Sequence, residues 1–206
     1  MNSSPTFTPD LMQSESEESK TDTDASQVFH PSFSSSDGDI VLAAKGGNLF
    51  FRLHSFVLKT TSSWFRTMLS LPQGQSALEV IYMDEEEGTH PPYTLDLLLR
   101  MVSGLPLLPV ADYDVVDKIL FAAEKYDMPG PVSTMRLLVM TPPFLDQPFR
   151  LYTVACRYGW EAEARFASTQ TLEHCLHDPE VRPLLQRLST DALLNLYALH
   201  HSRKEA

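Results

Sequence analysis

Residues 38–69 read GDIVLAAKGGNLFFRLHSFVLKTTSSWFRTML. Within them, residues 40–44 and 49–53 are short apolar runs typical of strands. Between these runs, Gly46-Gly47-Asn48 tolerates the positive φ angles of a hairpin turn. Residues 55–59 and 62–71 then place apolar side chains at helical spacing. We therefore predict a β-hairpin followed by two short helices.

The chain on the C-terminal side of this stretch predicts one more strand and several helices. Residues 78–83 are β-rich and indicate a third strand, which a charged loop at 84–88 follows. Helical spacing returns at 94–103, and a stronger apolar stripe follows Asp112, a suitable N-cap. Another helix is expected at 132–140. The fold class is α+β, with a small three-stranded sheet and surrounding helices.

The last third of the chain predicts helices alone. Pro142-Pro143 indicates a boundary, and helical patterns follow at 148–158, 160–174 and 189–202. The expected organisation is a disordered acidic tail (1–36), an α+β domain (37–141) and a helical extension (142–206).

The expected tail is rich in hydroxyl side chains and poor in aliphatic ones. Residues 1–36 hold ten Ser and four Thr, so burial cannot offset the entropy cost of ordering them. Up to Asp39 there are eight acidic residues and one Lys, a net charge of −7, which leaves −4 for the rest. Two interpretations stay open: a solvated leader, or a phosphorylatable segment whose charge each phosphate would increase.

Composition excludes several classes of protein. A formal net charge of −11 disfavours a nucleic-acid partner, because like charges repel. No apolar run approaches the length of a membrane span. Two cysteines, Cys156 and Cys175, are too few for a disulfide framework and fit a reducing compartment. We expect a cytoplasmic or nuclear protein without a membrane partner.

Motifs for chemistry are missing from the sequence. There is no nucleophile elbow, Walker loop or dinucleotide fingerprint, and Lys45-Gly46-Gly47 fits a hairpin turn better than an anion site. Cys156, His174, Cys175 and His177 could ligate zinc, but their spacing fits packing in the helical extension better. We expect no enzyme, and no cofactor or metal.

Four motifs within residues 38–140 together resemble a BTB/POZ domain. Asp39 matches the Asp before the family's core strand, and His54-x-x-Val57-Leu58 matches its His-x-x-Val-Leu. Ser62-Ser63-Trp64-Phe65 resembles its Ser-x-aromatic-Phe, and Leu120-x-x-Ala123-x-x-Tyr126 is similar to its Leu-x-x-Ala-x-x-Tyr helix. The helices after Pro142 resemble the extension of many fungal BTB proteins.

The resemblance implies a noncatalytic scaffold for protein association, commonly a homodimer. The alternatives are a cullin-type ubiquitin-ligase adaptor with a divergent contact, and a transcription-associated scaffold. Ser55 stands where repressor-type members often carry a basic residue, which weakens a repressor pocket. No Glu lies between Glu87 and Glu124, where cullin adaptors carry one, which weakens the cullin role.

Six residues are candidates for interaction or mark the fold. Asp39 and His54 are expected as fold markers, and Trp64 and Phe65 as core aromatics. Phe56, Trp64 and Met68 are also candidates for a surface that a second copy would bury. The expected partners are the chain itself and an unidentified protein, for which a cullin is one candidate. The set is Asp39, His54, Phe56, Trp64, Phe65 and Met68.

Overall fold

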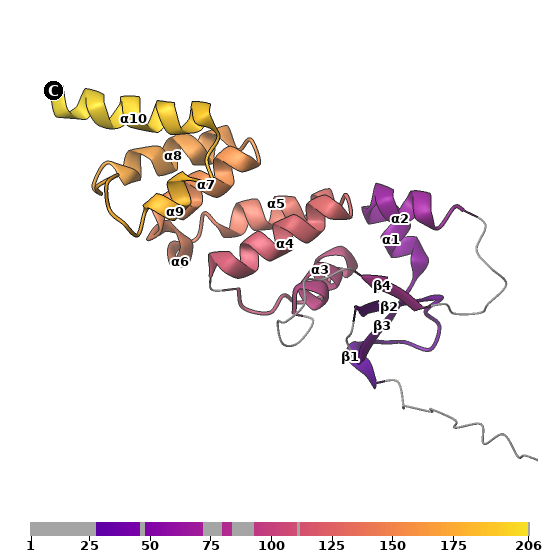
Figure 1. Cartoon of the computed structure of the whole chain (residues 1–206). Coiled ribbons are helices and arrows are strands. Elements are labelled where there is room, and N and C mark those ends of the chain that lie inside the picture. Colours follow the sequence, from indigo (N-terminus) through magenta and orange to yellow (C-terminus); the bar gives the residue numbers. More distant parts are fainter. Residues whose placement is uncertain (1–27, 46–47, 72–79, 84–92, 111, 206) are drawn as a thin grey trace, which may run out of the picture.

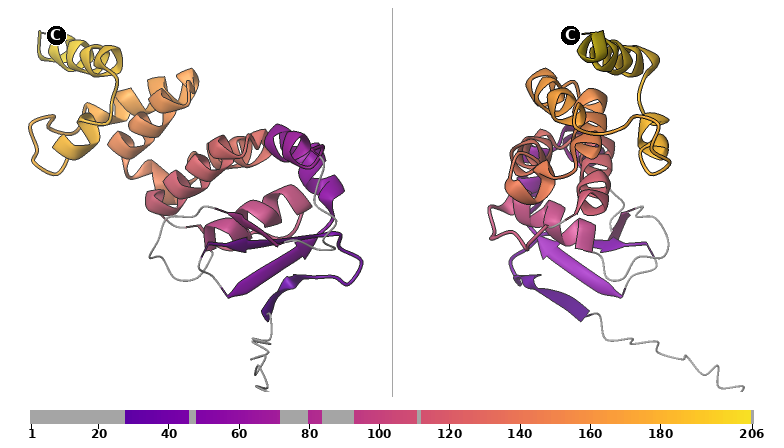
Figure 2. Two further views of the ribbon diagram at one scale, coloured as in Figure 1. Left: turned by 45° about the vertical axis from the view of Figure 1, so that its right-hand side comes forward. Right: turned by 90° about the vertical axis from the view of Figure 1, so that its left-hand side faces the viewer.

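The computed structural model describes residues 28–45, 48–71, 80–83, 93–110 and 112–205. In this part the chain is α+β, with a small sheet at one end and helices that lead away from it (Figure 1). The helical extension lies at the far end from the sheet (Figure 2). The predicted fold class is therefore confirmed.

The sheet has four strands in the order β1-β3-β2-β4. β2 and β3 form the predicted hairpin and are antiparallel, with Leu42 opposite Phe51. β1 is parallel to β3, and β4 is parallel to β2. Every residue of the central strand β2 is buried. The strands are β1 (Val28–Ser34), β2 (Ile40–Ala44), β3 (Leu49–Leu53) and β4 (Val80–Met83).

β1 makes two predictions wrong. The sheet has four strands instead of three, and residues 28–34 form a strand although all of 1–36 was expected to be disordered. Phe33 in β1 is buried, and the His30 ring stacks on Phe51 with 5.1 Å between ring centroids. Phe29 packs against Phe50 in a tilted arrangement, with 6.0 Å between ring centroids. The segment is poor in aliphatic residues, but its aromatic rings supply the apolar contact that an ordered strand needs. Residues 1–27, the turn residues 46–47 and the loop at 84–88 lie outside the described residues.

Five helices lie on one side of this sheet (Figure 2). Asp112 caps α4 as predicted, because its Oδ1 accepts a hydrogen bond from the Val115 N–H at 2.9 Å. α5 begins at Pro129, earlier than the predicted Val132, because proline is tolerated in the first turn of a helix. The helices are α1 (Ser55–Thr61), α2 (Ser63–Met68), α3 (Tyr93–Ser103), α4 (Tyr113–Lys125) and α5 (Pro129–Leu138).

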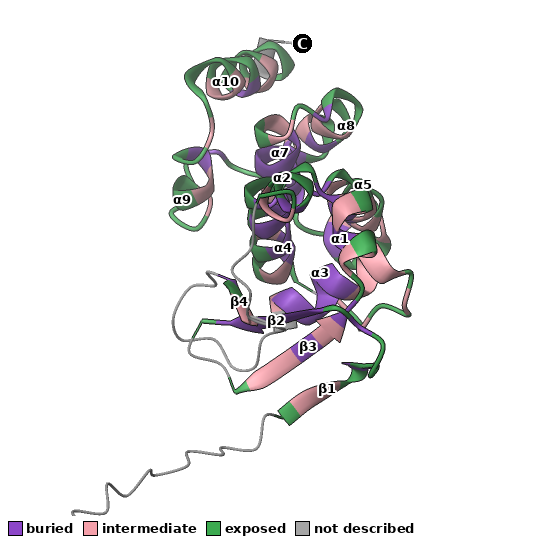
Figure 3. Cartoon of the chain, turned by 90° about the vertical axis from the view of Figure 1, so that its right-hand side faces the viewer, coloured by how far each residue is buried: buried purple, intermediate pink, exposed green. Residues whose placement is uncertain are grey.

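The extension is helical, as predicted, and contains two short helices that the sequence did not indicate. Its core joins that of the first part, since the rings of Tyr113 and Phe144 meet edge to face at 5.1 Å. Buried residues are concentrated in β2, α3, α4 and α7, while α10 is largely exposed (Figure 3). The helices are α6 (Pro142–Leu145), α7 (Pro148–Arg157), α8 (Glu161–Thr171), α9 (Arg182–Leu185) and α10 (Thr190–Glu205).

Candidate interaction surface

The short helices α1 and α2 present aromatic side chains to solvent. α1 buries only Leu58, and α2 buries only Phe65. On their other faces, Phe56 is 75% exposed and Trp64 is 39% exposed. We call the exposed sides of these two helices, which include Phe56 and Trp64, the α1–α2 surface. Aromatic residues are enriched in protein interfaces, which makes Phe56 and Trp64 candidates for one.

A buried serine holds α2 in place. The Ser62 Oγ accepts a hydrogen bond from the Phe65 N–H at 3.0 Å and so caps α2. The same hydroxyl donates to the Tyr126 carbonyl at the end of α4, at 2.6 Å. The Trp64 ring packs on Tyr126 with 5.3 Å between centroids, and Ser63 donates to the Asp127 carboxylate. The position of the exposed Trp64 is therefore set by α4.

Asp39 and Ser55 fix the start of α1. The two carboxylate oxygens of Asp39 accept hydrogen bonds from the Ser55 N–H and Oγ, both at 2.6 Å. Partial burial raises the pKa of Asp39, but the bonds from Ser55 outweigh it and leave the pKa below its ordinary value. His54 Nε2 lies 3.4 Å from Asp37 Oδ2 in an exposed pair. Ser55, noted in the sequence only as a departure, is thus the partner of Asp39.

The structure separates the six candidate residues into three groups. Phe65 is fully buried and belongs to the core, and Met68 is partly buried against that core. Asp39 and His54 lie where β3 leads into α1. Phe56 and Trp64 are the two that reach solvent on the α1–α2 surface, so Trp64 is only partly a core residue.

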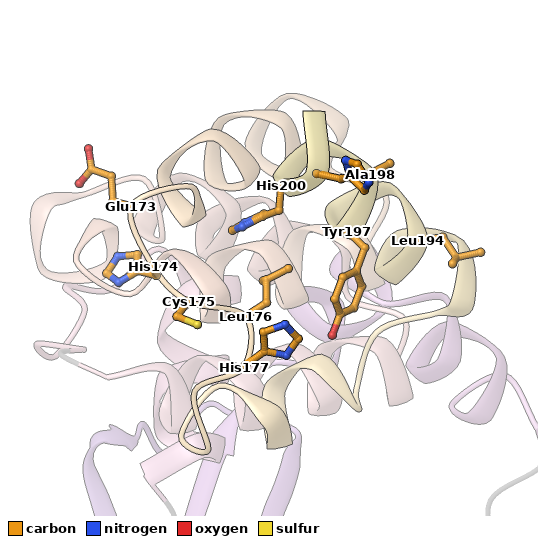
Figure 4. Close-up of a pocket in the computed structure, with 10 residues that line it drawn as sticks. Glu173, His174, Cys175, Leu176, His177, Leu194, Tyr197, Ala198 and His200 are labelled. Atoms are coloured by element: carbon orange, nitrogen blue, oxygen red, sulfur yellow. The ribbon is translucent and has the colours of Figure 1, made fainter. Parts of the chain in front are cut away.

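A separate pocket of about 880 Å³ lies in the extension, between residues 173–177 and α10 (Figure 4). Its imidazole and thiol groups include His174, Cys175 and His177 of the candidate zinc set, but Cys156 does not line it. Burial raises the pKa of the Cys156 thiol, which α7 holds beside Tyr152. Among the described residues, no three His, Cys, Asp or Glu side chains are arranged to hold a metal ion.

α10 supplies one side of this pocket, which the sequence did not indicate. His200 Nε2 lies 3.1 Å from the Thr171 Oγ1, whose proton goes to the Ser168 carbonyl at 2.7 Å. His200 therefore donates to Thr171 and ties α10 to α8. The sequence pattern that could have indicated this side of the pocket is the helical spacing of its α10 residues. These are Leu194, Tyr197, Ala198, His200 and His201.

No family model matches this chain, and no curated protein matches it. Among solved structures it is similar to the BTB domain of zebrafish PATZ1, at 17% sequence identity and a TM-score of 0.36. That similarity covers 50% of this chain and 75% of the other. In the part of the chain that the structure describes, no helix has the length and apolar character needed to cross a membrane.

Proposed function

We propose that this chain is a noncatalytic protein-interaction module that forms a homodimer through the α1–α2 surface. Residues 37–141 act as a BTB/POZ-like domain, and residues 142–206 extend it. The BTB/POZ-like motifs of residues 38–140 and the α+β fold support the proposal. The observation that carries it is the exposure of Phe56 and Trp64 on adjacent helices.

A two-fold contact through the α1–α2 surface would bury the exposed rings of Phe56 and Trp64. In a symmetric dimer the same patch of one copy meets that patch of the other. The exposed rings of both copies are therefore buried together. Aromatic side chains of this kind dominate interface energetics because each removes a large apolar area from water. The bonds of Ser62 to α4 hold Trp64 in a defined position before association. Preorganisation of this kind lowers the entropy cost of binding.

Light scattering after size exclusion, over a concentration series of the full chain, tests the proposal. We expect a dimer mass for the native chain and a monomer mass for Phe56→Asp, since a buried carboxylate without a partner is costly. The matched control is Leu137→Asp in α5, because Leu137 is also 75% exposed but lies on another helix. This control should stay dimeric. A native chain that is monomeric at micromolar concentration contradicts the proposal.

A further inference from the structure

The pocket between residues 173–177 and α10 has the size of a small-molecule site. Its volume of about 880 Å³ falls within the range of about 300–1,000 Å³ that such sites occupy. It lies in the helical extension, away from α1 and α2 (Figure 1). The pocket is therefore separate from the α1–α2 surface.

Hydrogen bonds hold α10 in place before and after its pocket residues. Near the start of the helix, the Tyr152 Oη donates to the Ala192 carbonyl at 2.8 Å. Near its end, the Arg203 guanidinium donates to the Leu172 carbonyl. These bonds keep α10 beside the segment that forms the other wall, so the pocket exists before a ligand arrives. A preformed site binds more tightly, because less order has to be gained on binding.

The lining of the pocket is largely apolar. Leu176, from the wall opposite α10, is only 7% exposed. On α10, Leu194 is 60% exposed and Tyr197 is 39% exposed. These two residues are three positions apart and so lie on the same side of the helix. A ligand with an apolar body would remove this surface from water, which is favourable.

Two polar groups of the pocket have no hydrogen-bond partner within the described part of the chain. They are the Tyr197 hydroxyl and the His177 imidazole. Figure 4 shows the Tyr197 ring pointing from α10 toward the segment that carries His177. A tyrosine hydroxyl and a neutral imidazole each offer one hydrogen-bond donor. Two donors beside an apolar lining match the two oxygens of a carboxylate.

The charges around the pocket permit an anion. Glu173 is the one acidic residue among those that line it, and Figure 4 shows its carboxylate turned away from His177. Asp178, which follows His177, accepts a hydrogen bond from the Glu180 N–H at 2.9 Å and so belongs to the next turn. The Arg203 guanidinium adds positive charge beside the same segment. An anion would therefore meet donors and a nearby cation, although the chain as a whole is acidic.

We propose that this pocket binds a small organic acid, which carries a carboxylate on an apolar body. The Tyr197 hydroxyl and the His177 imidazole donate to the carboxylate, and the apolar body lies against Leu176 and Leu194. The site goes beyond the proposed function and does not depend on it, because none of these residues belongs to the α1–α2 surface.

Isothermal titration of the full chain with naphthylacetate and with the neutral naphthylacetamide tests the site. The two probes share one apolar body and differ in the carboxylate, and decanoate is added as an acid with an aliphatic body. Each probe is measured with the native chain and with Tyr197→Phe, which removes only the hydroxyl. The matched control is Tyr82→Phe, because Tyr82 is 58% exposed but lies in β4 of the sheet.

We expect naphthylacetate to bind the native chain with a dissociation constant of about 0.1 mM, and naphthylacetamide to bind about tenfold more weakly. Tyr197→Phe should weaken binding of the acid about tenfold and of the amide much less. Tyr82→Phe should bind both probes as the native chain does.

Absence of binding by both acids at about 1 mM overturns the site. Equal affinity of the native chain for naphthylacetate and naphthylacetamide overturns the contact with a carboxylate. Equal affinity of Tyr197→Phe and the native chain for the acid overturns its placement in this pocket. A monomeric chain that binds the acid as expected supports the site and rejects only the proposed dimer.

Discussion

The guanidinium of Arg136 in α5 holds the carboxylate of Glu163 in α8 with two parallel hydrogen bonds, of 2.6 Å from Nε and 2.9 Å from Nη2. This pair of hydrogen bonds links α5 to α8 of the helical extension. Bidentate pairs fix orientation as well as adding energy. The hydrogen bonds from Arg136 lower the pKa of Glu163 below its ordinary value of 4.5, since they favour the charged form.

Glu163→Gln is expected to lower Tm at neutral pH by about 1–3 °C, because the pair is partly exposed. A carboxyl whose pKa is lowered by folding stabilises the protein above its unfolded pKa and loses this effect as pH falls through the folded value. The difference in Tm between native and variant should therefore shrink as pH falls below 4.5 and vanish once the pH has passed the lowered pKa of Glu163. Thermal unfolding followed by circular dichroism across pH checks this. Glu161→Gln, on the same helix but without an ion pair to the described residues, should change little at any pH.

Ser62→Ala is expected to lower the free energy of unfolding by about 1–3 kcal/mol. The variant removes the cap of α2 and leaves the buried Tyr126 carbonyl without the hydroxyl that donates to it. Urea denaturation measures the change. Thr67→Ala, at an exposed position of the same helix, is the control and should stay within about 0.5 kcal/mol of the native chain. Equal effects of the two substitutions would contradict the role assigned to Ser62.

Phe33→Ala is expected to loosen β1 without unfolding the hairpin of β2 and β3. Phe33 is 4% exposed and packs on Phe51, at 5.7 Å between ring centroids. Hydrogen exchange should therefore accelerate in residues 28–34 but much less in residues 40–44, because local opening follows local contact. Val28→Ala, at a position that is 57% exposed in the same strand, should leave the exchange unchanged. Uniform acceleration across the sheet would argue against a separately attached strand.

The two cysteines are expected to differ in reactivity towards a thiol reagent such as a disulfide dye. Cys175 is exposed, whereas Cys156 is partly buried and burial raises its thiol pKa above the ordinary value of 9.0. Because the thiolate is the reactive form, we expect one fast and one slow phase near pH 8. Cys175→Ser should remove the fast phase and Cys156→Ser the slow one. The rate of the slow phase should continue to rise above pH 9.0, since its thiolate forms later.

Local patterns predicted much of the fold. The hairpin at 40–53 and the helix that follows Asp112 were predicted, because a strand pair with a glycine turn and a capped apolar stripe depend on neighbours in sequence. The same holds for the long helices of the extension. Among the site residues, the sequence pointed to Phe56 and Trp64 as surface candidates, but it grouped the partly buried Met68 with them and also expected Trp64 in the core.

The sequence by itself determined the α+β class, the hairpin and the helical last third, since these depend on contacts between residues close along the chain. Only the tertiary structure decided that residues 28–34 form a strand, because β3, with which they pair, lies more than ten residues further on. It also decided which aromatic residues of α1 and α2 stay exposed. A helix of two turns has too few residues to define its own buried face, and for α2 this face is set by Tyr126, which follows the distant α4.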